Sequence, residues 1–166
     1  TSPHLVIWIG TQTNVKRAQS LFWSSLHSII KNKYHIQPVV AIDKITNFYD
    51  QAIHMESINL TKTADNLLWR INLDELSINI DMFRCNSGYF SEYHAIGLSE
   101  LSKIINKKYQ TLAYYGFSKK ELQDFIYQFK PSGIDRIVPI GKTMDFSFKW
   151  DGYDLITALS REIEIV

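Results

Sequence analysis

The sequence predicts a mixed α/β fold, with a partly parallel sheet and flanking helices. A continuous apolar run over residues 4–10 ends in a glycine and is typical of a buried parallel strand. Residues 111–141 read as strand, helix and strand with short links, which favours a parallel pair covered by its helix. Strict alternation of apolar and polar side chains over residues 66–74 indicates a half-buried strand. We therefore expect residues 1–166 to form a single α/β domain or a fragment of one.

The first half of the chain is expected to hold one strand, two helices and a hairpin. Thr13 is a candidate N-cap for the first helix, whose predicted buried face consists of Val15, Ala18, Phe22, Leu26, Ile29 and Ile30. After Pro38, Asp43 is the candidate N-cap of a second helix, with a predicted buried face of Ile45, Phe48, Tyr49, Ala52 and Ile53. The strand at 66–74 is predicted to pair with residues 60–63.

The second half is expected to alternate short strands and helices. A weakly patterned loop at 77–88 leads to a strand at 89–97 and to a short helix capped by Ser99. Ser118 and Glu121 form a capping box, followed by a helix face of Leu122, Phe125, Ile126 and Phe129. The last helix is expected to start at Asp151, its candidate N-cap, and to bury Leu155, Ile156, Leu159 and Ile163.

Composition narrows the class of protein. Of the 166 residues 45% are hydrophobic and 21% are charged, with a formal net charge of +1, so no basic excess suggests binding to nucleic acid. The apolar runs are too short for a membrane span. The single cysteine excludes an internal disulfide and a cysteine-based zinc site. It fits a reducing compartment, so we expect a cytoplasmic protein.

Few residues offer chemistry on their own. Cys85 with a histidine would be a thiol nucleophile and base, but no spacing supports this over an ordinary buried thiol. The five histidines show no metal-ligand spacing, so no metal site is expected. Glu92 and His94 share one face of a strand, either as an acid/base pair or as a hydrogen-bonded face. The residues alone therefore indicate an α/β domain without a self-contained active site.

Three motifs resemble a known family. Residues 109–117 read Tyr-Gln-Thr-Leu-Ala-Tyr-Tyr-Gly-Phe, residues 133–141 read Gly-Ile-Asp-Arg-Ile-Val-Pro-Ile-Gly, and residues 150–155 read Trp-Asp-Gly-Tyr-Asp-Leu. Together they resemble the carboxy-terminal part of the LuxC-type long-chain acyl-CoA reductases, the bacterial fatty-acid reductases associated with luminescence. The resemblance covers essentially the whole chain. It implies the catalytic-domain part of the aldehyde dehydrogenase fold.

The resemblance also implies an oxidoreductase activity. In that family a cysteine takes the acyl group of a fatty acyl thioester, and NADPH reduces the acyl-enzyme to the aldehyde. The family cysteine is expected just before Thr1, so Thr1, Ser2 and Pro3 would flank the nucleophile. No catalytic residue is then expected within residues 1–166.

Further residues are site candidates through the same resemblance. Glu92 stands near the glutamate that contacts the cofactor ribose in the superfamily, although shifted in register, and is a candidate for cofactor binding. Gln110 and Thr111, at the entry of a predicted strand, are substrate-site candidates. The implied partners are fatty acyl-CoA or an acyl-transfer enzyme, in a homo-oligomer or multienzyme complex.

Two alternatives remain open. The chain is compatible with a stand-alone α/β domain that has a scaffolding or assembly role and no catalysis, because no complete catalytic constellation lies within it. It is also compatible with an acyltransferase that uses Cys85 as its nucleophile.

Overall fold

A computed structural model describes residues 3–165, which divide after Ile104 into two compact units. No linker and no change of composition marks this division in the sequence, where we expected a single domain. The first unit holds a four-stranded sheet with its helices, and the second holds the motifs of residues 109–155.

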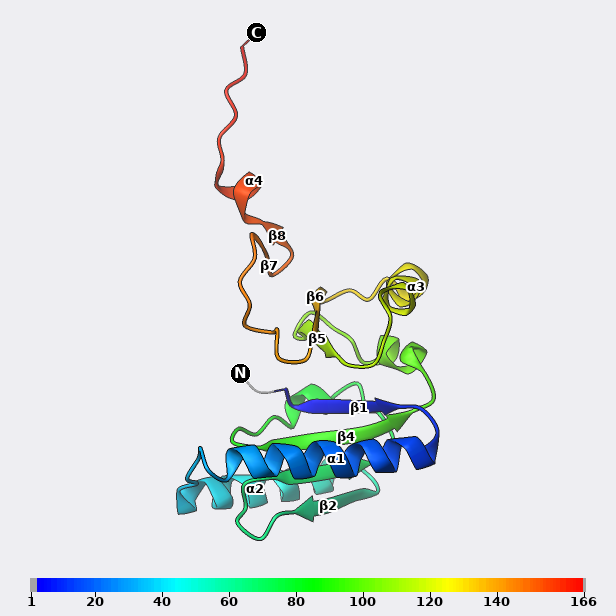
Figure 1. Ribbon diagram of the computed structural model, residues 1–166, viewed down its shortest axis with the longest axis vertical. Coiled ribbons are helices and arrows are strands. Elements are labelled where there is room, and N and C mark those ends of the chain that lie inside the picture. Colours follow the sequence, from blue (N-terminus) through cyan, green and yellow to red (C-terminus); the bar gives the residue numbers. More distant parts are fainter. Residues whose placement is uncertain (1–2, 166) are drawn as a thin grey trace. The chain divides into compact units, whose positions relative to one another are not determined.

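The sheet of the first unit is mixed and mostly parallel, as the sequence predicts. Its strands are β1 (Leu5–Ile9), β2 (Ile58–Lys62), β3 (Trp69–Leu73) and β4 (Tyr89–Ala95). They lie in the order β1-β4-β3-β2, so that β1 lies beside β4 (Figure 1). The β1–β4 and β4–β3 pairs are parallel, and β2 is antiparallel to β3. The predicted hairpin is thereby confirmed.

The two long helices, α1 (Gln12–Ile30) and α2 (Pro38–His54), cover opposite faces of this sheet. Successive side chains of a strand point to opposite faces, and β4 shows this clearly. Phe90 packs against Trp23 of α1, whereas Ser91 accepts a hydrogen bond from Gln51 of α2. The first unit is therefore a three-layer α/β arrangement with β4 inside it.

Helix α1 begins earlier and faces the sheet with other residues than the sequence predicts. Its N-cap is Thr11, whose hydroxyl accepts from the amide of Asn14, so the Thr13 prediction is wrong. Within the described chain the residues of α1 that lie buried or half-buried are Val15, Gln19, Trp23, Leu26, His27 and Ile30. Val15, Leu26 and Ile30 are buried or half-buried as predicted, whereas Ala18, Phe22 and Ile29, predicted to be buried, are exposed. The stripe is rotated because Gln19 and Trp23 reach a polar partner in the sheet, which apolar periodicity does not reveal.

Helix α2 reverses the predicted face. It starts at Pro38 with Gln37 as N-cap, so Asp43 is not the cap. The fully buried side chains are the polar Lys44 and Gln51. The exposed ones include several large apolar side chains, namely Val39, Ile42, Ile45, Tyr49 and Ile53. The polar face of α2 points inwards because its side chains form hydrogen bonds there. Lys44 donates to two backbone carbonyls, and Gln51 binds Tyr89 and Ser91.

The rest of the first unit consists of short pieces. A 3₁₀ turn, η1 (Ile80–Met82), lies in the predicted loop. The helix predicted after Ser99 is a 3₁₀ helix, η2 (Leu98–Lys103), and Gly97 is its N-cap. The Glu100 carboxylate of η2 accepts hydrogen bonds from the Ile96 amide and the Tyr93 hydroxyl. The hydrogen bond from the Ile96 amide is the main reason that the pKa of Glu100 lies below its ordinary value.

The second unit contains the predicted strand–helix–strand unit. Strands β5 (Gln110–Tyr114) and β6 (Ile134–Pro139) pair in parallel, and α3 (Lys119–Phe129) connects them. The capping box is confirmed, because the Glu121 amide donates to Ser118 Oγ over 3.2 Å and the Ser118 amide donates to Glu121 Oε2 over 2.7 Å. Leu122 and Phe125 are buried as predicted, while Ile126 is exposed.

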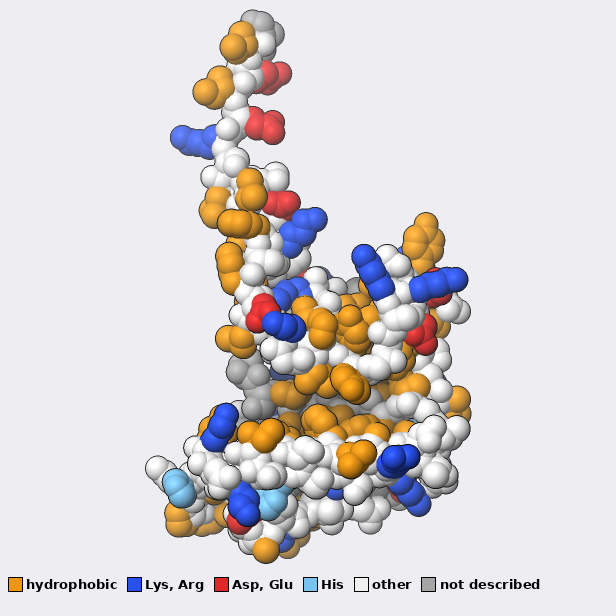
Figure 2. Space-filling model, viewed as in Figure 1, with side chains coloured by type: hydrophobic (Ala, Val, Ile, Leu, Met, Phe, Trp, Pro, Cys, Tyr) orange, Lys and Arg blue, Asp and Glu red, His pale blue; other side chains and the backbone are white. Residues whose placement is uncertain are grey.

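The chain after β6 departs from the prediction. It forms a small hairpin of β7 (Lys149–Trp150) and β8 (Tyr153–Asp154), followed by α4 (Leu155–Leu159). Asp154, not Asp151, caps this helix. The predicted buried face is wrong, because α4 is only five residues long and buries none of them, with Leu159 83% exposed. Figure 2 shows hydrophobic side chains gathered along this segment towards the carboxy terminus. No helix among residues 3–165 is both long and apolar enough to span a membrane.

The outer edge of β1 predicts self-association. Among residues 3–165, β1 pairs with β4 alone. The His4 carbonyl accepts from the Ser91 amide, so by alternation the even residues of β1 face β4 and the backbone of Ile7 faces outwards. Because an unpaired apolar edge invites a further strand, we expect sedimentation velocity to show concentration-dependent oligomers. Ile7→Pro, which removes an outward amide, should reduce them, while Ile7→Val should not. A monomer at high concentration contradicts this.

Lys44 gives the stability of the protein a defined pH dependence. Burial lowers the pKa of its ammonium group from an ordinary value of 10.5 to about 8. Between these values the unfolded chain holds the proton and the folded protein does not, so the folded state becomes more stable as the pH rises. The free energy of unfolding in urea should therefore rise by on the order of 2 kcal/mol from about pH 8 to pH 10, relative to Lys44→Met. The exposed Lys16→Met should follow the wild type. Parallel profiles for wild type and Lys44→Met contradict the assignment.

Candidate functional site

A buried carboxylate lies at the centre of the first unit. Glu92 of β4 is 1% exposed and accepts four hydrogen bonds. Its Oε2 atom accepts from Trp8 Nε1 at 2.7 Å, from Trp23 Nε1 at 2.8 Å and from Gln19 Nε2 at 3.2 Å. Its Oε1 atom accepts from Arg70 Nε at 2.6 Å, which makes an ion pair. Both oxygens are thus fully engaged.

Regular elements position these donors. In the parallel ladders Trp8 is paired with His94 and Arg70 with Phe90, so each donor lies diagonally next to Glu92 on the same face. Gln19 and Trp23 are one helical turn apart on α1 and point at that face. Four elements therefore converge on one carboxylate, and each supplies at least one member of the cluster.

Arg70 connects this cluster to the surface. Its guanidinium carbon lies 5.1 Å from the ring centroid of Trp23, in cation–π range, and its side chain is 19% exposed. Among the hydrogen bonds of the described chain, Arg70 donates through Nε alone. Its two terminal amino groups therefore remain available towards the cleft that Arg70 lines.

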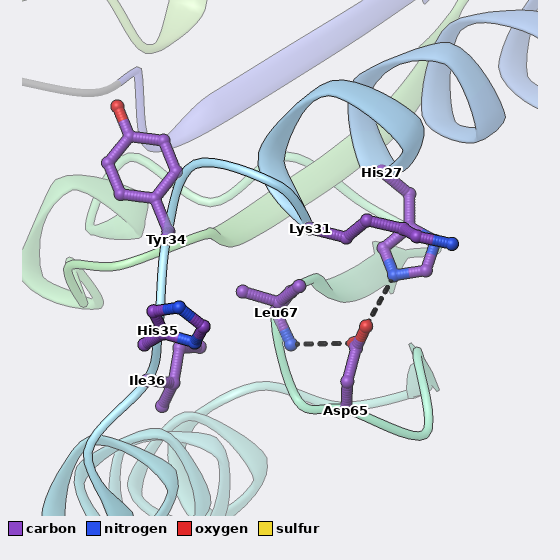
Figure 3. A pocket seen from close by; sticks show the side chains of 7 residues that line it. All are labelled: His27, Lys31, Tyr34, His35, Ile36, Asp65 and Leu67. Atoms are coloured by element: carbon purple, nitrogen blue, oxygen red, sulfur yellow. Dashed lines mark hydrogen bonds and ion pairs between the residues drawn. The ribbon is translucent and has the colours of Figure 1, made fainter.

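Two shallow clefts adjoin at His27. The first holds about 370 Å³ and is lined by His27, Lys31, Tyr34, His35, Ile36, Asp65 and Leu67 (Figure 3). In it His27 Nε2 lies 2.7 Å from Asp65 Oδ2, and the Leu67 amide donates to Asp65 Oδ1 over 3.1 Å. The Thr63 hydroxyl, followed by the contact with His27, lowers the pKa of Asp65 to about 2. Asp65 is therefore a fixed anion of the hairpin turn.

The second cleft is basic and rich in hydroxyl groups. It holds about 260 Å³ between α1 and the β2–β3 hairpin. Its lining consists of Ser20, Trp23, Ser24, His27, Thr61, Lys62, Thr63, Leu68 and Arg70. No carboxylate belongs to this lining, although Glu92 and Asp65 each bind one of its members.

Cys85 is half-buried beside the opposite face of the sheet. Burial raises the pKa of its thiol, and Lys44 and the Asn86 amide only partly offset this. A nucleophilic cysteine needs the opposite shift, towards thiolate at neutral pH. The raised pKa of this half-buried thiol therefore favours an ordinary thiol over the acyltransferase alternative.

The sequence-predicted site residues fall in separate places. Thr1 and Ser2 lie outside the described residues, and Pro3 is exposed ahead of β1. Glu92 is buried as described above, and the neighbouring His94 donates from Nε2 to the Gly10 carbonyl over 2.7 Å instead of facing the Glu92 carboxylate. The structure does not bring Glu92 and His94 together as an acid/base pair.

Gln110 and Thr111 belong to the second unit. Gln110 is exposed at the start of β5 with a φ of 54°, and the β5–β6 register shifts between Gln110 and Thr111. A positive φ is rare outside glycine and marks a constrained backbone. Both residues remain substrate-site candidates by resemblance.

Sequence reasoning missed the donors of Glu92. It identified Glu92, placed Trp8 in an apolar run and Arg70 in an alternating strand, and singled out neither Gln19 nor Trp23. One signal was present: Arg70 is the only charged side chain inside the buried β3 alternation. A charge in that position requires a counter-charge nearby, and a search for buried acids in the neighbouring strand would have found it.

Two of the motifs that carry the family resemblance pack together in the second unit. The guanidinium carbon of Arg136 lies 4.2 Å from the ring centroid of Trp150. The terminal amino groups of Arg136 donate to the carbonyls of Thr143 and Asp145 over 3.2 and 2.9 Å. Gly152 is required there, because its φ is +81° and a Cβ atom would lie 2.9 Å from Asp135 Oδ1. Residues 133–141 and 150–155 are therefore in contact within the second unit.

We also searched for metal-binding clusters and for related proteins. Among residues 3–165 no group of three histidine, cysteine, aspartate or glutamate side chains is placed to hold a metal ion. No protein-family model matches the chain, and no curated protein matches it.

Replacement of Glu92 tests the cluster. Glu92→Gln removes the counter-charge of Arg70 and places an amide where only acceptors fit. Breaking one partner of a buried ion pair costs roughly 3–5 kcal/mol, so we expect a loss of about 3 kcal/mol in the free energy of unfolding. Urea unfolding followed by tryptophan fluorescence measures it. The exposed Glu56→Gln is the matched control and should stay within about 0.5 kcal/mol of wild type. Equal midpoints for both variants would refute the assignment.

Proposed function

We propose that this chain supplies part of an NADPH-dependent acyl-CoA reductase, which converts a fatty acyl thioester to an aldehyde through a cysteine acyl-enzyme. The observation that carries the proposal is the packing of Arg136 on Trp150, with Gly152 against Asp135. These residues belong to the two most specific motifs of the resemblance. Their mutual contact supports a shared element, inherited as a unit, over a chance likeness of separate segments.

The first unit supports the same proposal at a coarser level. Its partly parallel sheet with helices on both faces is compatible with the catalytic-domain layer that the resemblance implies. In the proposal the cysteine stands next to Thr1, and Pro3 leads directly into β1. Trp8 of β1 donates to Glu92, so Glu92 acts as a positioning residue for the strand that follows the nucleophile.

The reaction requires a thiolate, an acyl thioester and a hydride donor. The thiolate attacks the thioester carbonyl, the CoA thiolate leaves, and an enzyme-bound thioester remains. NADPH, when bound, supplies the hydride that displaces the cysteine and releases the aldehyde. Glu92 does not fit the ribose contact in the geometry described, because its carboxylate is buried and both of its oxygens already accept from Trp8, Gln19, Trp23 and Arg70. No step is assigned to it beyond positioning.

In this proposal the protein acts in the cytoplasm, with acyl-CoA or an acyl-transfer enzyme as partner.

Acyl transfer and reduction test the proposal. A polypeptide that carries the expected cysteine ahead of Thr1 should consume NADPH and release aldehyde when given a long-chain acyl-CoA. Alanine in place of that cysteine should abolish both, whereas Cys85→Ala should retain activity within about twofold. Mass spectrometry should locate the acyl group on that cysteine. Acylation of Cys85, or turnover that survives loss of the other cysteine, would rule the proposal out.

One observation favours a second candidate, an assembly role without catalysis. The outward face of α2 exposes five large apolar side chains, of which Ile53 is 79% exposed. Monomeric proteins rarely leave such a stripe uncovered. Under this alternative, Ile42→Asp should abolish complex formation, and no variant of the protein should oxidise NADPH.

A further inference from the structure

We propose that the cleft between α1 and the β2–β3 hairpin binds a phosphate group of a small molecule. Arg70, Lys62, His27 and the hydroxyls of Ser20, Ser24 and Thr61 line it. Cationic and hydroxyl donors are the groups that recognise phosphate oxygens. The inference does not rest on the proposed reductase activity, and either can fail without the other.

Arg70 is the residue expected to make the main contact with the phosphate group. The bond to Glu92 and the stacking on Trp23 fix its side chain from two sides. Its planar guanidinium then presents its terminal amino groups, which match two phosphate oxygens in a bidentate contact. Because the side chain is already ordered, binding does not require its immobilisation, a cost of about 0.5–1.5 kcal/mol for a flexible side chain.

Lys62 belongs to the other face of the hairpin. Lys62 is paired with Trp69, and Thr61 with Arg70, so the side chains of Lys62 and Arg70 point to opposite faces. The Lys62 ammonium accordingly lies 4.9 Å from the centroid of the Trp69 ring and 3.4 Å from Asn66 Oδ1. Arg70 is therefore the cation of the cleft, and Lys31 of the adjoining cleft is a second one without a carboxylate partner among the described residues.

The floor and size of the cleft suit a compact anion. Trp23 and Leu68 close it below as members of the hydrophobic core. Its volume of about 260 Å³ is enough for a mono- or diphosphate. The adjoining cleft beyond His27, with Tyr34 and Ile36, provides apolar surface for an attached nucleoside.

Nuclear magnetic resonance titration of the full chain tests the proposal. The probes are inorganic phosphate, pyrophosphate, adenosine diphosphate and adenosine, at constant ionic strength so that general screening does not change. Saturable shifts should concentrate on the amides of residues 20–27 and 61–70 and on the Trp23 indole. Pyrophosphate should bind about tenfold more tightly than phosphate, because its second phosphate group adds negative charge and further acceptors for the hydroxyl donors of the cleft. Tighter binding of adenosine diphosphate than of pyrophosphate would identify the ligand as a nucleotide; equal binding would identify it as free diphosphate.

Matched variants make the test specific. Arg70→Lys, which loses the bidentate guanidinium, should weaken pyrophosphate binding about fivefold or more, while Lys62→Gln, which removes a charge on the other face of the hairpin, should leave it nearly unchanged. Thr61→Val provides a second cleft variant if Arg70→Lys does not fold. The proposal is overturned by shifts that never saturate, by equal losses for Arg70→Lys and Lys62→Gln, or by adenosine binding as tightly as adenosine diphosphate.

Discussion

The burial of one carboxylate organises the first unit. A charge as buried as that of Glu92 is tolerated only when it is paired and its lone pairs are satisfied. Arg70 supplies the counter-charge, while Trp8, Gln19 and Trp23 supply neutral donors. These residues belong to β1, α1 and β3. The hydrogen bonds to the Glu92 side chain therefore determine how three elements pack against β4. The indole rings add apolar area around the charge, which excludes water from it.

The opposite face of β4 repeats the principle with neutral groups. Gln51 donates to Ser91 and accepts from the Tyr89 hydroxyl at 2.7 Å, and burial raises the pKa of Tyr89 above its ordinary value. Lys44, two helical turns before Gln51 on α2, donates to the carbonyls of Asn66 and Leu67. The central strand therefore has polar contacts on both sides. Specific hydrogen bonds, in addition to apolar area, decide which face each helix presents.

The sequence predicts what depends on near neighbours and fails where distant contacts decide. The hairpin, the parallel β5–β6 pair and the Ser118–Glu121 capping box all follow from patterns within a few positions, and the structure contains each of them. The buried face of α2 was inverted because its partners lie 22 to 40 positions away. The candidate site shows the same limit: Glu92 was identified from its own strand, whereas its donors lie 22 to 84 positions away. The last helix failed for another reason, since an apolar periodicity predicts burial only where a covering surface exists.

The pairing of β1 with β4 has a consequence for synthesis. Trp8 and Glu92 are 84 positions apart, and no strand nearer in the described sequence pairs with β1. On a ribosome that adds about 5–20 residues per second, the first strand waits roughly 4–17 s before its neighbour is made. During that interval β1 is an apolar segment without a partner, the kind of segment that chaperones bind. The central carboxylate thus makes the earliest-made strand of the unit one of the last to become stable.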